Sequence, residues 1–509
     1  MVARFSRLCA VLAAGVLVLT AGCSAGAGTS DGDAGSGQTG ATPVSLAVGF
    51  SAEPATLDFT TTDGAAIPEA LLVNVYEGLV KLDGDGEIVP LLAESYEVSD
   101  DRRTYTFVLR EDVTFTNGAE FTAEDVAFSI ERVQSDAWTS SLKSYMDVVD
   151  AVEVVSPTEV AVTLARPDNE WLFQMTTRIG AMFSRTGVDD LANTPVGTGP
   201  YVLERWTRGD SILLGRNDDY WGEPPQADEV TLQYFKDPTA LTNALRSGGI
   251  DVISSVQAPE SLAQFEGDDR FQVVEGTTNG ELTMALNGDR PALADVRVRR
   301  AITHAIDRQA LVDTAWAGYG TPVGSMVPPT DPWYEDLTDV HPYDPDAARA
   351  LLAEAGAQDL SLRFRVPNLP FSVGPAQVVK SQLAEVGITA EIDVLEFPAR
   401  WLDEVFTKGD FDMSIVAHVE PHDLPTFANP EYYWHYDNPE IAELLTAANT
   451  GTQEEQVENM KKAARTLAED AAAVWLFVVP NLVVAEADVQ GIPQNRIGEA
   501  FDLTTLSRS

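Results

Sequence analysis

The chain has 509 residues, with 79 acidic and 33 basic side chains and a formal net charge of −46. A protein this negative repels phosphate backbones and anionic lipid, so we expect no nucleic-acid partner. Its two cysteines, Cys9 and Cys23, lie within the first 23 residues, which leaves no disulfide and no thiolate chemistry for the rest of the chain.

The N-terminus has the three-part pattern of a secretory signal. Arg4 and Arg7 form a basic start, residues 8–19 are apolar, and small residues follow up to Cys23. The apolar stretch is too short to cross a membrane as a stable helix. A cysteine at this place resembles the lipobox of bacterial lipoproteins, although Thr20 stands where that motif usually has Leu.

This resemblance implies that residues 1–22 are a lipoprotein signal peptide and that Cys23 becomes the lipidated N-terminus. In the alternative interpretation, Cys23 is a leftover thiol of an ordinary signal. Residues 23–43 are almost all Ser, Gly, Ala, Thr and Asp, which predicts a flexible linker between the lipid anchor and the folded protein.

Beyond the linker, strand-like and helix-like segments alternate, which predicts mixed α/β architecture. Residues 105–110 (YTFVLR) carry large apolar side chains at every second position, as a half-buried strand requires. Thr122, with Asp125 three residues later, predicts the cap of a following helix.

Three later segments also give local predictions. Residues 295–312 are amphipathic with a helical period and predict one helix. Asp344 and Pro345 predict the start of a helix that Gly356 ends. The apolar residues 471–484 are interrupted by Pro480, which predicts a buried strand with a turn.

Several motifs occur in the order in which one protein family has them. The signature block comprises residues 105–110, VTF at 113–115, NG at 117–118 and FTAEDVAFS at 121–129. Flanking motifs are PATLD at 54–58, YEGLV at 76–80, PLLA at 90–93, GTGPY at 197–201, LRSGGID at 245–251, DVRVRRAI at 295–302 and LAEVGI at 383–388. Together they resemble the family 5 solute-binding proteins of ABC importers, the dipeptide- and oligopeptide-binding type.

The resemblance covers about residues 44–505 and implies an α/β fold of the periplasmic-binding-protein-like type II class, in its large three-lobe form. It implies a lobe I of residues 44–84, 196–284 and 485–509. Lobe II would be an inserted lobe of residues 85–195, and lobe III would comprise residues 285–484. Two strand crossings would form a hinge, and the solute would be enclosed by closure of the lobes.

The family has an aspartate, seven residues before a Phe in a loop that lines the cleft, which receives the ammonium group of the solute. Counting back from Phe427 gives Glu420, and Asp423 takes this role if the register shifts. A charge-assisted hydrogen bond of this kind is among the stronger ones available. The chain lacks the Trp that peptide-binding members often have before this acid, which puts peptide specificity in doubt. In the alternative, both acids belong to the surface of the loop.

His418 and His422 lie in the same loop and are further candidate solute contacts, with His435 nearby. Histidines and acids together suit nickel or zinc, but such residues near aromatic side chains are more often packing or hydrogen-bonding groups. We therefore assign no metal and no cofactor. The aromatic residues 432–434 and 436 would wall the pocket or pack the lobe, with sugar stacking as the alternative.

Three residues elsewhere complete the candidate site. Arg365 lies near the place where dipeptide-binding relatives have an arginine for the solute carboxylate. Trp401 follows another strand, and Asn287 opens the predicted lobe III. Each of them also has a structural interpretation.

The predicted function is that of an extracytoplasmic, lipid-anchored, monomeric binding protein. It would deliver peptides or a similar small solute to the permease and ATPase of an ABC importer. A secreted hydrolase is the main alternative, but residues 44–509 have no Gly-x-Ser-x-Gly motif and the chain has no His-Glu-x-x-His motif. A sensor lipoprotein with the same fold, and a sugar or metal-chelate binder, remain open.

Overall fold

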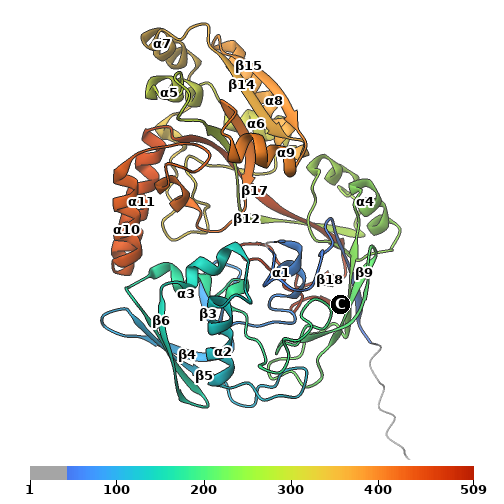
Figure 1. Cartoon of the computed structure of the whole chain (residues 1–509). Helices are drawn as coiled ribbons and strands as arrows, with labels where there is room; N and C mark the ends of the chain where they lie inside the picture. Colours follow the sequence, from blue (N-terminus) through green and yellow to red (C-terminus); the bar gives the residue numbers. More distant parts are fainter. Residues whose placement is uncertain (1–42, 63) are drawn as a thin grey trace, which may run out of the picture. The chain divides into compact units, whose positions relative to one another are not determined.

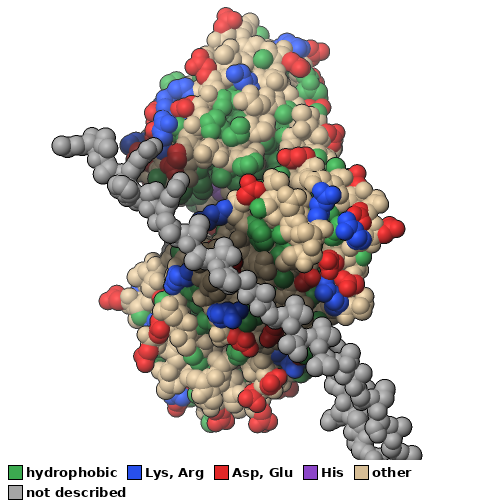
Figure 2. All heavy atoms as spheres, turned by 90° about the vertical axis from the view of Figure 1, so that its right-hand side faces the viewer, with side chains coloured by type: hydrophobic (Ala, Val, Ile, Leu, Met, Phe, Trp, Pro, Cys, Tyr) green, Lys and Arg blue, Asp and Glu red, His purple; other side chains and the backbone are tan. Residues whose placement is uncertain are grey.

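The computed structural model describes residues 43–62 and 64–509, of which residues 43–509 form one compact unit. The predicted signal peptide, Cys23 and the linker up to residue 42 lie outside the described residues. Within the described part, no helix combines the length and the apolar character needed to cross a bilayer. Acidic side chains are scattered over the face shown in Figure 2 and do not gather in one patch.

The largest sheet has the strand order β15-β14-β16-β12-β17-β11-β1-β10-β9-β8, and β13 pairs with β17 beside this path. Its strands are β1 (Ser45–Phe50), β8 (Tyr201–Thr207), β9 (Ser211–Arg216), β10 (Glu229–Tyr234), β11 (Val252–Ile253), β12 (Phe271–Leu286), β13 (Thr321–Pro322), β14 (Ser361–Pro367), β15 (Thr389–Leu395), β16 (Met413–His418) and β17 (Ala473–Glu486). The two longest strands, β12 and β17, run side by side and join the two ends of this sheet (Figure 1).

A second, antiparallel sheet has the order β4-β5-β7-β6 and lies within the range predicted for lobe II. Its strands are β4 (Ala93–Val98), β5 (Thr104–Leu109), β6 (Val149–Ser156) and β7 (Glu159–Leu164). Two small sheets pair β2 (Val80–Leu82) with β3 (Ile88–Pro90), and β18 (Val489–Gln490) with β19 (Ser507–Arg508). The predicted mixture of α and β is confirmed, whereas the lobe boundaries stay a prediction.

Helices and shorter helical turns cover the sheets (Figure 1). The α-helices are α1 (Ala66–Leu71), α2 (Ala123–Gln134), α3 (Asn169–Gln174), α4 (Pro238–Arg246), α5 (Val296–His304), α6 (Arg308–Ala315), α7 (Pro345–Ala355), α8 (Pro370–Glu385), α9 (Ala399–Trp401), α10 (Pro439–Thr450) and α11 (Gln453–Glu469). The shorter turns are η1 (Ser141–Met146), η2 (Arg178–Gly180), η3 (Pro259–Gln264), η4 (Thr338–Val340), η5 (Leu402–Thr407) and η6 (Leu424–Ala428).

Local sequence signals placed several elements correctly. In β5, buried and less buried side chains alternate, as the pattern predicts. Asp125 accepts hydrogen bonds from the backbone and the hydroxyl of Thr122 at 3.1 and 3.0 Å, which caps α2. At α7, the Asp344 carboxylate accepts from two backbone amides, and Gly356 ends the helix with a left-handed φ of 70°.

Two local predictions are wrong. The helix predicted over 295–312 is divided into α5 and α6, because Asp307 caps a new helix by accepting from the Ala310 amide at 2.9 Å. The turn predicted at Pro480 does not form, and β17 continues through it. Pro480 pairs with Thr277 where the register of β12 shifts, so its missing N–H is tolerated by an irregular ladder.

Three buried apolar clusters flank the site described below. The first fills the space around the second sheet and the N-terminal strands. Another packs α5, α6 and α8 against β12, β14 and β16. The third is rich in aromatic residues and packs α10 and α11 against β16, β17 and the loop that follows β16. This third cluster supports the loop in which the sequence places the solute contacts.

Candidate functional site

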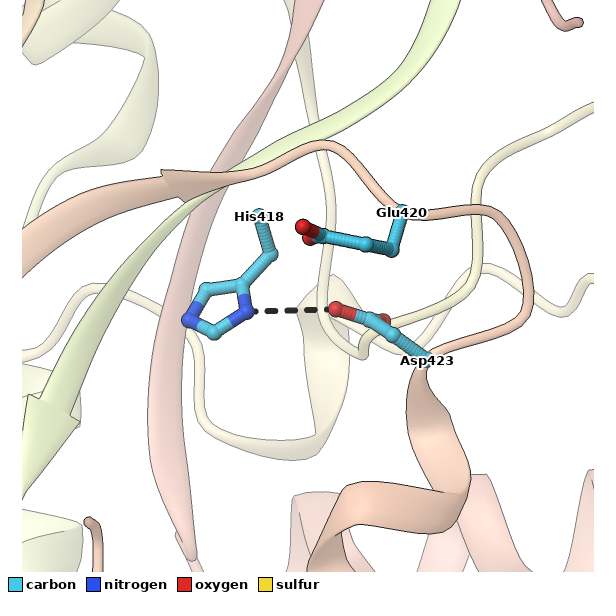
Figure 3. A group of neighbouring side chains, drawn as sticks. All are labelled: His418, Glu420 and Asp423. Carbon is cyan, nitrogen blue, oxygen red and sulfur yellow. Dashed lines mark ion pairs between the residues drawn. The ribbon is translucent and has the colours of Figure 1, made fainter. Parts of the chain in front are cut away.

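The candidate site forms where β16 ends and its chain turns into a loop. His418, the last residue of β16, is buried, and its Nε2 lies 2.9 Å from the Tyr433 hydroxyl. Its Nδ1 pairs with Oδ2 of Asp423 at 3.2 Å (Figure 3). Glu420 is exposed, and one donor atom from each of His418, Glu420 and Asp423 lies within 4.8 Å of the others. The structure therefore brings three predicted contacts into one group.

His422 makes a different set of contacts and links the loop to α3. Its Nδ1 lies 3.0 Å from Oε2 of Glu170, and its ring stacks on Phe173 at 3.7 Å between centroids. Its Nε2 lies 3.9 Å from Oδ1 of Asp331. Burial opposes the positive charge of His422, but Glu170 and Asp331 outweigh it and raise the pKa to about 8. His422 therefore serves as a cationic link at neutral pH.

Glu281 is a buried acid of this site that sequence reasoning missed. It pairs with His418 across β12 and β16, so both side chains point to the same face of the sheet. Its residue is 1% exposed, and its Oε2 has no hydrogen-bond partner among the described residues. Burial, followed by the nearby Asp423 and Asp331 carboxylates, raises the pKa of Glu281 well above its usual value. The sequence does carry a signal for Glu281, because a charged residue is unusual in the otherwise apolar strand segment 281–286.

Burial also raises the pKa values of two other acids of the site. It raises the pKa of Asp423, although His418 opposes the shift. It raises the pKa of Asp331 to about 6, with His422 again opposing. The site is therefore rich in acidic groups, and within the described residues these acids pair with His418 and His422.

The remaining predicted contacts lie in other packing arrangements. Arg365 pairs with Glu404 and Asp410 at 2.9 Å each and with Asp393 at 3.6 Å. Asn287 is buried and donates to the carbonyls of Gly409 and Phe411. These contacts already satisfy both polar groups, and their roles in solute binding stay predictions.

Trp401 and the aromatic run belong to the third cluster. Trp401 is buried, donates from Nε1 to Ser414 Oγ at 3.1 Å, and packs against Tyr433. Trp434 is fully buried, and Tyr432 remains half-buried. Packing of the lobe is thus the main role of the run. His435 pairs with Asp289 at 3.5 Å, apart from the other two histidines.

Comparison with known proteins decides the family. Residues 87–439 match the family described as bacterial extracellular solute-binding proteins, family 5. The chain belongs to this family. Its members are solute-binding proteins of ABC importers rather than enzymes, so the hydrolase interpretation has no support.

Similar proteins include glutathione-binding protein GsiB of Salmonella paratyphi A. It is 31% identical over 370 residues, which cover 70% of this chain and 72% of GsiB. GsiB of Escherichia coli O1:K1 is 30% identical over 372 residues with the same coverage.

Solved structures confirm the fold class. The substrate-binding protein CtaP of Listeria monocytogenes superposes with a TM-score of 0.82 and 23% identity, covering 91% of this chain and 99% of CtaP. NikA of Brucella suis in complex with Fe(III)-EDTA superposes with a TM-score of 0.82 and 24% identity, covering 91% of this chain and 100% of NikA. DppA of Helicobacter pylori in complex with the peptide STSA superposes with a TM-score of 0.75 and 23% identity, covering 92% of this chain and 98% of DppA. The solute-binding protein described here therefore has the type II periplasmic-binding-protein fold.

Proposed function

We propose that this solute-binding protein captures peptides, or peptide-like solutes with an α-ammonium group, by closure of its lobes. It then delivers them to the permease and ATPase of its importer. The observation that carries this proposal is the Glu420–Asp423 acid pair beside His418 at the end of β16. Relatives named as a glutathione-binding protein and solved with a bound peptide support the same class of solute.

The finer proposal for its location is that Cys23 carries the lipid that holds the protein at the outer face of the cell membrane. Two observations on the sequence support it, the three-part signal and the small residues before Cys23. The mass of the mature N-terminal peptide tests it, because diacylation adds two acyl chains that an unmodified cysteine lacks.

Peptide binding is tested by thermal unfolding of the mature protein with a peptide library. A solute that binds only the folded state raises the melting temperature, and the rise grows with the logarithm of its concentration above its Kd. If no peptide shifts the transition, the peptide class is wrong. Mass spectrometry of the solute that copurifies then identifies the class that replaces it.

Replacing Glu420 by glutamine is expected to weaken peptides with a free N-terminus by about 1.5–3 kcal/mol, the range for a hydrogen bond to a charged group. Glutamine keeps the size of the side chain but removes the charge that attracts an ammonium group. Isothermal titration calorimetry measures the change. Glu431→Gln is the matched control, since it removes one charge from an exposed position near the same loop. Equal affinities for Glu420→Gln and wild type would remove Glu420 from the site.

A metal-chelate solute is the second candidate. The donor atoms of His418, Glu420 and Asp423 lie within 4.8 Å of one another, and mixed nitrogen and oxygen donors suit zinc or nickel. Relatives solved with Fe(III)-EDTA and with Ni(L-His) belong to the same fold. Metal analysis of the purified protein together with its copurifying solute distinguishes the two classes.

A further inference from the structure

The candidate site holds more carboxyl groups than one ammonium group can contact. Its acids are Glu170, Glu281, Asp331, Glu420 and Asp423. The ion pairs within it are made by His418 with Asp423 and by His422 with Glu170 and Asp331. Among residues 43–62 and 64–509, no Lys or Arg forms an ion pair with any of these acids. Glu420 and Glu281 therefore remain without a cationic partner.

Glu281 differs from Glu420 because it is buried. Its residue is 1% exposed, and its Oε2 accepts no hydrogen bond within the described part of the chain. A buried polar group without a partner is costly, and structural acids in a core normally have donors that satisfy them. Glu77 of this chain is such a case, because Trp221, Thr198 and Tyr220 all donate to its carboxylate. The Oε2 of Glu281 has no such donor within the described part of the chain, and Glu281 therefore fits a group that a solute completes.

Glu281 lies on β12, opposite the strand end that leads to Glu420. Glu281 lies opposite His418 on the same face of the sheet, and His418 is two residues from Glu420. The register of β12 shifts just before Glu281, a feature that often redirects a side chain near a binding site. Its carboxylate is close enough to Asp423, Asp331 and Glu420 to be affected by their charges. The site thus has an outer acid, Glu420, and an inner acid, Glu281.

We propose that Glu281 forms a second cationic subsite and that the preferred solute carries two positive groups. This inference rests on the proposed function, in which Glu420 and Asp423 hold the α-ammonium group. The side chain of the first residue starts at the carbon that bears this ammonium, so we assign the second positive group to this side chain. The solutes favoured are then peptides that begin with Lys or Arg.

The test compares two tripeptides, Lys-Ala-Ala and norleucine-Ala-Ala, which differ by the ammonium group of the first side chain. We expect the wild-type protein to bind Lys-Ala-Ala at least about 10-fold more tightly, as a charge-assisted contact in a buried place allows. The Glu281→Gln variant should bind the two peptides within about 3-fold of each other. Isothermal titration calorimetry measures all four affinities.

The control is Glu275→Gln, which removes one negative charge from an exposed position on the same strand. It should keep the preference for Lys-Ala-Ala, which separates a local contact from the attraction of a negative protein for any cation. Thermal unfolding confirms that each variant is folded.

The outcomes separate the inference from the function on which it rests. Equal affinity of the wild type for both peptides overturns the second subsite but leaves peptide capture in place. A preference for Lys-Ala-Ala that survives in Glu281→Gln removes Glu281 as its cause. If neither peptide binds to the wild type, the proposed function fails, and the inference fails with it.

Discussion

Replacing Arg178 by methionine is expected to lower the free energy of unfolding by about 3–5 kcal/mol, the cost of breaking a buried ion pair. Arg178 lies in η2 and is buried, and its Nε donates to Oε1 of Glu499 at 2.7 Å. Its backbone amide donates to Oε2 of the same carboxylate at 2.7 Å. Methionine fills the space of the side chain but leaves the Glu499 carboxylate, whose side chain is only 13% exposed, without its counter-charge. Urea denaturation followed by circular dichroism measures the loss.

The double variant Arg178→Met/Glu499→Gln is the decisive control for this prediction. Removing both charges avoids the uncompensated carboxylate, so most of the lost stability should return. Arg349→Met breaks a pair with Asp346 in which the arginine side chain is 50% exposed, and should change stability by less than about 1 kcal/mol. A double variant as unstable as Arg178→Met would refute the explanation by an unpaired charge.

The elements predicted correctly are those whose signals lie within a few residues. The alternation in β5, the Thr122–Asp125 cap of α2 and the Asp344 and Gly356 ends of α7 all depend on side chains that contact their own backbone. Such signals need no knowledge of the rest of the fold.

One of the two wrong predictions depends on contacts that are distant in the sequence. Pro480 continues a strand because Thr277, about 200 residues earlier, faces it at an irregular point of the ladder. A proline in a single strand otherwise argues for an end or a turn. No local pattern around Pro480 reveals the register of β12.

The sequence predicts only those parts of the candidate site whose residues are close together along the chain. His418, Glu420 and Asp423 lie within six residues, and the structure brings them together. Glu170 and Glu281 come from α3 and β12, so only the folded chain shows that they join the same acidic group. Arg365 fitted the family pattern, but its guanidinium is taken by three carboxylates that its own sequence neighbourhood does not contain.

Replacing Trp434 by alanine is expected to cost about 3–5 kcal/mol of stability, the usual range for removing a buried tryptophan. Its indole is fully buried and stacks on Phe427 with 4.2 Å between centroids and an angle of 6°. It also contacts His418, at 5.0 Å between ring centroids. Because the loop that carries Glu420 lies between these two contacts, the variant should also bind peptide roughly 10-fold more weakly, about 1.4 kcal/mol.

The variant Trp316→Ala separates the expected loss of peptide affinity from the expected loss of stability. Trp316 is 5% exposed and packs on Phe477 in another apolar cluster, so its removal should cost similar stability. The apolar cluster around Trp316 includes none of residues 418–427, so peptide affinity should stay within about 2-fold of wild type. Both variants are measured by calorimetry with Lys-Ala-Ala at a temperature where each is folded. If both lose affinity equally, the loss follows from global stability, and Trp434 has no particular part in holding the loop.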